Sequence, residues 1–221
     1  NQVAQDDQRG VNEQQAAGKI LEQAVEVELA ALKMNGANFA VAFGQRVNPQ
    51  GVPLEDGRRV SFDANGLEAV EFLVAPNPGE GLKPLVKIAS GGETSRLMLA
   101  IKNVLARADQ VPTLIFDEID QGIGGRVGTV VGKKLWELAR QHQVLCVTHL
   151  PQLAAFGEEH FQVQKALVEG RTVTQVAALS GEKRLIELAQ MMGEVSDGTR
   201  QSARELFEAA RQALTLHQTD H

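Results

Sequence analysis

Apolar residues recur with a helical period near the start of the chain. Between Glu13 and Met34 there are few helix breakers, and two apolar stripes run along the predicted helix. One stripe has the alternating four-and-three spacing of heptads: Ile20, Ala24, Val27, Ala31 and Met34. The other lies beside it: Leu21, Val25, Leu29 and Leu32. This short pattern fits either a core helix or the last turns of a coiled-coil arm, and Asn35-Gly36 should end it.

Alternating apolar and polar positions follow this helix. They predict one strand around Phe39–Phe43 and a second strand over Glu68–Val74. Between them, Gly44–Gly57 contains two Pro and three Gly and predicts a long loop or a loose hairpin. We therefore expect antiparallel strands and loops over residues 36–82.

Short continuous apolar runs then alternate with helical segments. Helices are predicted over Glu93–Asp109 and Val127–Gln141, and strands over Thr113–Phe116 and Val144–Thr148. Because helices separate the two strands, they should run parallel in one α/β sheet and be buried on both faces. The remaining chain predicts a hairpin and two helices, over Phe161–Val163, Thr172–Leu179, Lys183–Met192 and Asp197–Leu214.

Composition and charge narrow the class of protein. A chain of 221 residues, 43% of them hydrophobic, suits one main domain with attachments. No apolar stretch approaches the roughly 20 residues that cross a bilayer, and the single Cys146 excludes an internal disulfide. The net charge of −6 argues against this segment being the main DNA-gripping surface. The chain starts with neither Met nor a signal-peptide pattern, so we expect it to be a piece of a longer protein.

A glycine turn precedes the first central helix. Ser90-Gly91-Gly92-Glu93 stands where a Pro- and Gly-rich loop becomes helical. A helix N-terminus offers unpaired N–H groups and partial positive charge, and two glycines let the backbone approach a ligand, so the motif suits a phosphate. Ser followed three residues later by Glu is also a capping box, so an ordinary helix cap explains the same residues.

Two acidic residues end the first central strand. In Thr113–Glu118 the apolar residues drive the strand into the core, and Asp117 and Glu118 follow at its carboxyl end. Ligands of open α/β sheets bind at that edge. Asp117 is suited to hold Mg²⁺ on a nucleotide, and Glu118 to act as a general base toward water. The alternative is that both acids cap the next helix and face solvent.

A histidine follows the second central strand in the same way. Thr148-His149-Leu150-Pro151-Gln152 comes directly after an apolar run, so His149 should lie at the same sheet edge as the two acids. There it can contact a γ-phosphate or orient a water molecule, although a lone His is more often structural. Between the two motifs, Asp120–Gly125 predicts a flexible acidic loop and lacks the spacing of a dinucleotide fingerprint.

The order and spacing of these motifs resemble the ABC ATPase superfamily. By this resemblance, Ser90–Glu93 is the signature motif, Asp117 and Glu118 are the Walker B pair, Asp120 is the D-loop acid and His149 is the switch histidine. Catalytic roles are implied for Glu118 and His149, and a Mg²⁺-binding role for Asp117. The implied nucleotide-binding residues are Ser90, Gly91, Gly92, Glu93 and Asp120. Ser90 and Gly92 are expected to contact the γ-phosphate of ATP held by a second head.

Longer strings resemble the RecN family of SMC-like DNA repair ATPases, over most of Glu13–Ala213. The resemblance is strongest at the motifs and loosest in Gly44–Asp63; Gly124-Gly125 is a minor departure, because relatives often carry a small polar residue there. The strings that carry it are Lys87–Glu93, Ser95–Lys102, Ile115–Asp120, Val147–Ala154, Val70–Phe72 and Asn77–Glu80.

This resemblance implies a fold and a division of the chain. The fold is the C-terminal lobe of an ABC-type (P-loop NTPase) head, a mainly parallel α/β sheet with flanking helices, a coiled-coil stub and antiparallel strands. Residues 1–35 would end the coiled-coil arm, residues 36–82 would join arm to head, and residues 83–221 would form the C-terminal half of the head. The implied setting is the cytoplasm, in association with the nucleoid.

One expected motif is absent from the sequence. No G-x-x-x-x-G-K-[ST] string occurs, so the chain has no Walker A loop to hold the β-phosphate. The resemblance places that loop in an N-terminal half of the same head. The implied partners are therefore that half, a second head in an ATP-dependent homodimer, and DNA, with no membrane. We expect this chain alone to bind ATP poorly and to turn over essentially none.

Three other functions were weighed. A transporter ATPase subunit would keep Walker A on the same chain and often has Gln after the signature glycines; Glu93 and the preceding helix argue against it. A cohesin- or Rad50-like clamp would use the same chemistry with far longer arms. A non-catalytic interaction module would not need Asp117, Glu118 and His149. The role of Arg96, within the signature helix, is open at this level.

Overall fold

A computed structural model describes residues 2–54, 56–62, 67–88, 91–106, 108, 110–168 and 171–219 of the chain. The chain forms two compact units, Asn1–Ser90 and Gly91–His221. The first unit therefore groups the N-terminal helix with the antiparallel strands. The three-part division at residues 35 and 82 stays a prediction.

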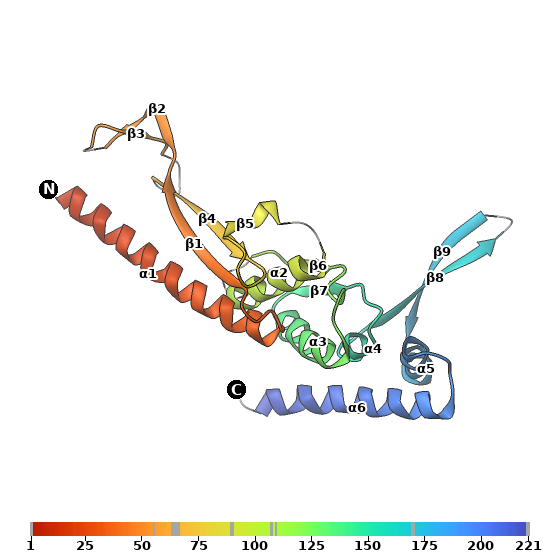
Figure 1. The fold of residues 1–221 in the computed structure, drawn as a ribbon. Coiled ribbons are helices and arrows are strands. Elements are labelled where there is room, and N and C mark those ends of the chain that lie inside the picture. Colours follow the sequence, from red (N-terminus) through yellow and green to blue (C-terminus); the bar gives the residue numbers. More distant parts are fainter. Residues whose placement is uncertain are drawn as a thin grey trace. The chain divides into compact units, whose positions relative to one another are not determined.

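The first unit consists of one long helix and short antiparallel sheets (Figure 1). Its elements are α1 (Gln2–Ala31), β1 (Asn38–Gln45), β2 (Val47–Pro53), β3 (Arg59–Val60), β4 (Glu68–Ala75), β5 (Lys83–Pro84) and the 3-10 helix η1 (Leu85–Lys87). Strands β1, β4 and β5 form one sheet, and β2 pairs with β3 across a register shift. The segment expected to be a loop or loose hairpin is therefore the end of β1 followed by an irregular hairpin. The helix starts at Gln2 rather than Glu13.

The two apolar stripes of α1 have different environments. Val25, Leu29 and Leu32 are fully buried. On the heptad stripe, the exposed fractions of Ile20 and Val27 are 69% and 68%. The stripe beside the heptad therefore supplies the core of this unit, and the heptad stripe stays open along much of its length.

Glutamates of α1 cover the free edge of β1. The N–H of Val41 donates to Glu22 Oε1 at 2.8 Å, and the N–H of Phe39 donates to Glu26 Oε1 at 3.4 Å. An unpaired strand edge exposes backbone donors that can recruit another strand. Here glutamate side chains of α1 accept hydrogen bonds from two of those N–H groups, as the carbonyl groups of a neighbouring strand would.

The spacing of these contacts fits the geometry of a helix lying along a strand. Four helical residues rise about 6 Å, and two strand residues span about 6.7 Å. Gly18 lies four residues before Glu22 on α1, and Phe43 lies two residues after Val41 on β1. A Cβ added at Gly18 would lie 3.0 Å from the ring of Phe43. Contacts four residues apart on α1 thus match positions two apart on β1, which fixes the helix along its axis.

Removing these glutamates should loosen β1 without unfolding the chain. The Glu22→Ala, Glu26→Ala double variant leaves two partly buried N–H groups without an acceptor, at a cost of about 1 kcal/mol each. We expect amide hydrogen exchange at Val41 and Phe39 to accelerate by about fivefold or more, since 1.4 kcal/mol is about tenfold. Gln23→Ala, on an exposed position of the same helix, is the control. Unchanged exchange at both amides would show that the glutamates do not protect this edge.

The second unit contains the α/β region and a hairpin. Its elements are α2 (Gly92–Leu105), β6 (Thr113–Phe116), α3 (Gly125–Ala139), β7 (Gln143–Cys146), α4 (Pro151–Ala154), β8 (His160–Val168), β9 (Arg171–Leu179), α5 (Gly181–Met192) and α6 (Asp197–Thr219). The β8–β9 hairpin projects away from the helices of this unit (Figure 1). Strands β6 and β7 are parallel, as predicted from the helix between them.

Within the described residues of the second unit, the parallel sheet is covered on one face only, and the predicted burial on both faces is not seen there. Leu114 and Phe116 are buried, whereas their neighbours on the other face remain open. The exposed fractions there are Ile115 69%, Leu145 45% and Val147 62%. A two-stranded parallel sheet with an apolar open face is unusual, since parallel sheets are normally covered on both sides. The continuous apolar runs predict strands that are buried on both faces. Among the described residues of the second unit, one of these faces is exposed.

Some predicted element ends also shift. Helix α2 stops at Leu105 instead of Asp109, and α3 begins at Gly125 instead of Val127. Strand β7 ends at Cys146 although the apolar run continues. Thr148 leaves the strand because its hydroxyl bonds to Asp120 and accepts the N–H of Leu150.

Arg184 closes the carboxyl end of α4, the short helix that follows His149. Its guanidinium donates to the carbonyl oxygens of Ala154 at 3.0 Å and Glu158 at 3.1 Å, and lies 4.8 Å from the ring centroid of Phe207 on α6. Carbonyl groups at a helix end have no partner within the helix, so a cation that bonds to them stabilises that end. Helices α4, α5 and α6 are thereby held together beside the sheet.

Candidate functional site

The candidate site lies where the two parallel strands end. Phe116 and Cys146 are partners in the register, and the N–H of Val147 bonds to the carbonyl oxygen of Phe116 at 2.9 Å. Asp117 follows β6 and His149 follows β7. The sheet therefore brings the acidic motif and the histidine motif to one edge.

The two adjacent acids are both exposed and have different local geometry. Asp117 Oδ1 accepts the N–H of Glu118 at 2.9 Å, and the Ser95 hydroxyl on α2 donates to the Asp117 carbonyl oxygen at 2.8 Å. Glu118 has a φ of 58°, in the left-handed region that a residue with a side chain rarely adopts. Its backbone is thus turned out of the strand direction directly after the sheet ends, and its carboxylate is left open to solvent.

Asp120 lies beneath the histidine and faces inward. Its residue is 4% exposed, and its Oδ2 accepts hydrogen bonds from the Thr148 hydroxyl at 2.5 Å and the His149 N–H at 2.8 Å. The Nδ1 of His149 is 3.1 Å from the same oxygen, while the His149 side chain is 76% exposed. This carboxylate orients an imidazole whose other edge remains in solvent. A contact between Asp120 and nucleotide stays a prediction.

The glycine turn forms the N-terminal end of α2. The helix starts at Gly92 with Gly91 as its N-cap, at φ 148°, and Gly91 has no side chain that could cap it. Ser90 lies outside the described residues, and Glu93 is an exposed residue of the first turn. The N-cap position of this helix belongs to Gly91, and the capping-box interpretation of Ser90 stays a prediction.

Gln121 is a residue of this site that the sequence reasoning missed. Its side-chain oxygen accepts the N–H of Gly92 at 3.2 Å. A Cβ added at Gly92 would lie 2.5 Å from the Gln121 backbone oxygen and 2.9 Å from its Cβ, so only glycine fits there. The loop after the acids therefore packs against the glycine turn. In the sequence, only the position of Gln121 between the acidic motif and the histidine motif indicates that it belongs to the site.

Cys146 lies next to the acids and is chemically quiet. Burial, and after it the negative charges of Asp120 and Asp117, raise the pKa of its thiol from 9.0 to about 12. The influence of both carboxylates places them around the end of β7. A thiol that stays protonated is a poor nucleophile.

The folded chain should therefore react slowly with thiol reagents. At pH 8 we expect a disulfide-exchange reagent to label Cys146 at least tenfold more slowly in the folded chain than in urea, where the thiol regains its ordinary pKa. The neutral thiol favours the fold below about pH 9, and this contribution to stability is lost as pH rises toward about 12. Equal labelling rates in both states would contradict the assignment.

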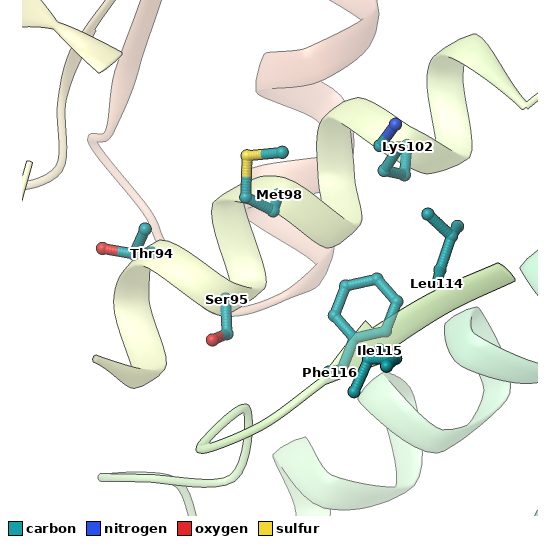
Figure 2. Close-up of a pocket in the computed structure, with 7 residues that line it drawn as sticks. All are labelled: Thr94, Ser95, Met98, Lys102, Leu114, Ile115 and Phe116. Carbon is teal, nitrogen blue, oxygen red and sulfur yellow. The ribbon is translucent and has the colours of Figure 1, made fainter. Parts of the chain in front are cut away.

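The pocket between α2 and β6 is separate from these groups. Figure 2 shows the side chains of α2 and β6 that line this pocket. Its volume is about 210 Å³. It is lined by Thr94, Ser95, Met98, Lys102, Leu114, Ile115 and Phe116. Neither acid nor the histidine lines it. The candidate site is instead an open edge of the sheet.

The residues present fit part of an ATP–Mg²⁺ site. Asp117 is exposed and uses one carboxylate oxygen for a backbone bond, and Mg²⁺ on a nucleotide commonly takes one or two carboxylates with phosphate oxygens and water. Within the described residues, no group of three or more His, Cys, Asp or Glu side chains could hold a metal without other ligands. The sequence offers no cradle for the β-phosphate. The residues at this edge therefore fit part of such a site, and a nucleotide site here stays a prediction.

Comparison with known proteins gives consistent relatives, although no family model matches the chain. The chain is 45% identical over 190 residues to the DNA repair protein RecN of Streptomyces coelicolor, covering 85% of this chain and 33% of that protein. It is 41% identical over 192 residues to RecN of Bacillus subtilis, covering 85% and 33%. With RecN of Xylella fastidiosa it shares 52% identity over 131 residues, covering 59% and 24%. The chain thus spans about one third of the length of the first two relatives.

A solved structure shows the same fold. The Smc head domain with a coiled coil and joint from Pyrococcus yayanosii aligns over 85% of this chain and 32% of that chain, with a TM-score of 0.52 and 21% identity. The fold is therefore that of an SMC-type ATPase head lobe, as the sequence predicted. Among the described residues, no helix is long and apolar enough to span a membrane.

Proposed function

This chain belongs to the RecN family, and from that premise we propose that it is the C-terminal part of an ATP-hydrolysing head in a DNA repair protein. The observation that carries the proposal is the shared sheet edge. Two exposed acids, a histidine oriented by a buried carboxylate, and the glycine turn of α2 all meet the loop that joins β6 to α3. Hydrolysis of a phosphoanhydride needs acids and a histidine near the reacting phosphate, and a helix N-terminus suits a phosphate held by a second head.

The open face of the sheet supports a composite head. Ile115, Leu145 and Val147 leave an exposed apolar surface on β6 and β7 among the described residues of the second unit. Burying such surface is favourable by about 25 cal/mol per Å². We propose that a Walker A-bearing N-terminal half of the same protein supplies the missing strands and covers this face. The open heptad stripe of α1, which includes Ile20 and Val27, would pack against a second helix of a coiled-coil arm.

Within this composite site, each residue would have a separate task. Asp117 would hold the Mg²⁺ bound to ATP, and this cation would neutralise phosphate charge. Glu118 would take a proton from the attacking water, because its carboxylate is exposed and turned away from the strand. His149, held through Asp120, would bond to the γ-phosphate or orient the water. The N-terminus of α2, with Ser90, Gly91, Gly92 and Glu93, would face the γ-phosphate of ATP on a second head.

The remaining parts of the proposal rest on the resemblance of the sequence motifs to the family. We propose that two complete heads associate in the presence of ATP and that hydrolysis separates them. DNA would be the substrate of the whole protein, bound largely outside this acidic segment. The setting would be the cytoplasm at the nucleoid. These are statements about a whole protein of which this chain matches about one third.

Mixing the two halves tests the proposal. We expect no ATP turnover from this chain alone and measurable turnover after mixing with a separately made Walker A half of the same protein. Ile115→Asp should abolish association, because an acid in a buried apolar interface costs several kcal/mol, and it should not unfold a chain in which Ile115 is 69% exposed. Val47→Asp, a matched change at a residue 71% exposed, is the control. A stable mixed complex that binds ATP without turnover would refute the hydrolase proposal.

A further inference from the structure

Arg96 is a buried cation to which the proposed function gives no task. It lies in the second turn of α2 and is 7% exposed. Among the described residues, no carboxylate forms an ion pair with it, and its buried Nε has no partner. Burial lowers the pKa of this guanidinium, while the charge of Glu93 raises it. An unpaired buried charge is costly, so the contacts that Arg96 makes are expected to matter.

Those contacts lie on one loop. Arg96 Nη1 donates to the carbonyl oxygen of Gln121 at 3.0 Å and to that of Ile119 at 3.4 Å. The two carbonyl groups flank Asp120, whose carboxylate holds the N–H and the ring of His149. One guanidinium on α2 therefore fixes both ends of the short segment from which the histidine is oriented.

The same segment also contacts the start of α2. The side-chain oxygen of Gln121 accepts the Gly92 N–H, and its backbone leaves no room for a side chain at Gly92. A phosphate oxygen at the N-terminus of α2 would compete with Gln121 for that N–H. A structural change at the glycine turn would thus displace the loop Ile119–Gln121, which Arg96 holds in position.

We propose that Arg96 is a positioning residue that couples the glycine turn of α2 to His149 through the loop Ile119–Gln121. This inference rests on the proposed function, since His149 must act in hydrolysis for its orientation to affect turnover. Arg96 itself touches neither the acids nor the histidine in the recorded contacts. Its effect is transmitted by two backbone carbonyl groups and one carboxylate.

Variants of Arg96 in the full-length protein test the coupling. Arg96→Ala should lower kcat by about 100-fold, the usual cost of misplacing a reacting group by about 1 Å, with KM changed by less than about threefold. Arg96→Lys should recover to within about tenfold of wild type, because a single nitrogen can donate to both carbonyl groups. Millimolar guanidinium, well below denaturing concentrations, should raise the kcat of the Ala variant several-fold. Arg204→Ala, at an exposed arginine of α6, is the control.

A second measurement separates positioning from stability. Amide hydrogen exchange at His149 should accelerate in folded Arg96→Ala, because its N–H bond to Asp120 depends on the loop. If Arg96→Ala does not fold, Arg96→Met, which keeps a long side chain without a donor, is compared in the same two assays, and wild-type kcat and exchange in a folded Met variant overturn the inference. Wild-type kcat and exchange in a folded Ala variant overturn it as well. Absence of turnover in the wild-type protein instead refutes the proposed function, and the exchange measurement still tests the coupling.

Discussion

Replacing Glu118 with Gln in the full-length protein should lower the rate of ATP hydrolysis by about 1,000-fold, within the range expected for loss of a general base. Gln keeps the size of the side chain and its hydrogen-bonding oxygen but cannot accept a proton from water at neutral pH. Glu118 is exposed and has no recorded side-chain partner in the part of the chain that the structure describes, so stability should change little. Nucleotide binding should persist, because Asp117 and the glycine turn are untouched.

The measurement is steady-state phosphate release, with ATP binding measured separately on the same preparation. Glu208→Gln, the same chemical change at an exposed position of α6, provides the control and should behave as wild type. If Glu118→Gln retained more than about one tenth of wild-type turnover, a different group would have to activate the water. If binding were lost together with turnover, Glu118 would belong to the binding site and not to the chemical step.

Adding one methyl group at Gly92 should have the second largest effect. The new Cβ would lie 2.5 Å from the Gln121 carbonyl oxygen and 3.0 Å from Arg96 Nη1, so the loop has to move. We expect Gly92→Ala to reduce turnover of the full-length protein by about 100-fold and to destabilise this chain by about 2 kcal/mol. The loop that moves is the one that holds Asp120, so His149 should be displaced as well.

Urea unfolding of the chain and turnover of the full-length protein measure the two parts of this prediction. Gly44→Ala is a suitable control, because a Cβ at Gly44 would meet nothing within 4 Å. Wild-type stability and turnover in Gly92→Ala would show that the glycine turn and the loop are not packed as the structure has them. Loss of stability alone would mean that the packing is structural and does not reach the reacting groups.

Sequence patterning was sufficient for the elements that build the sheet edge. Thr113–Phe116 has the predicted bounds, and its pairing with β7 is parallel as the intervening helix required. The positions of Asp117 and His149 at one edge follow from this pairing, since parallel strands end on the same side. The element ends were less accurate, because Thr148 leaves the strand to bond with an acid far away in the sequence.

Local sequence alone could not assign the environment of Asp120 or Arg96. Asp120 was predicted to be a nucleotide-binding acid, and the structure places it inward, with its carboxylate taken by Thr148 and His149. The role of Arg96 was left open, and its contacts are with carbonyl groups more than twenty residues away. Such contacts depend on how α2 packs beside the loop and leave no periodic signal in the chain.

The sequence by itself determined the order of helices and strands and the sheet edge that carries the acids and the histidine. These follow from apolar periodicity and motif spacing, because burial of an apolar face is a local constraint that repeats along each element. Only the tertiary structure decided that one face of the sheet is open, that Glu22 and Glu26 cover the edge of β1, and that Arg96 and Gln121 join the glycine turn to the loop. Those contacts join segments distant in sequence, so their partners are set by packing.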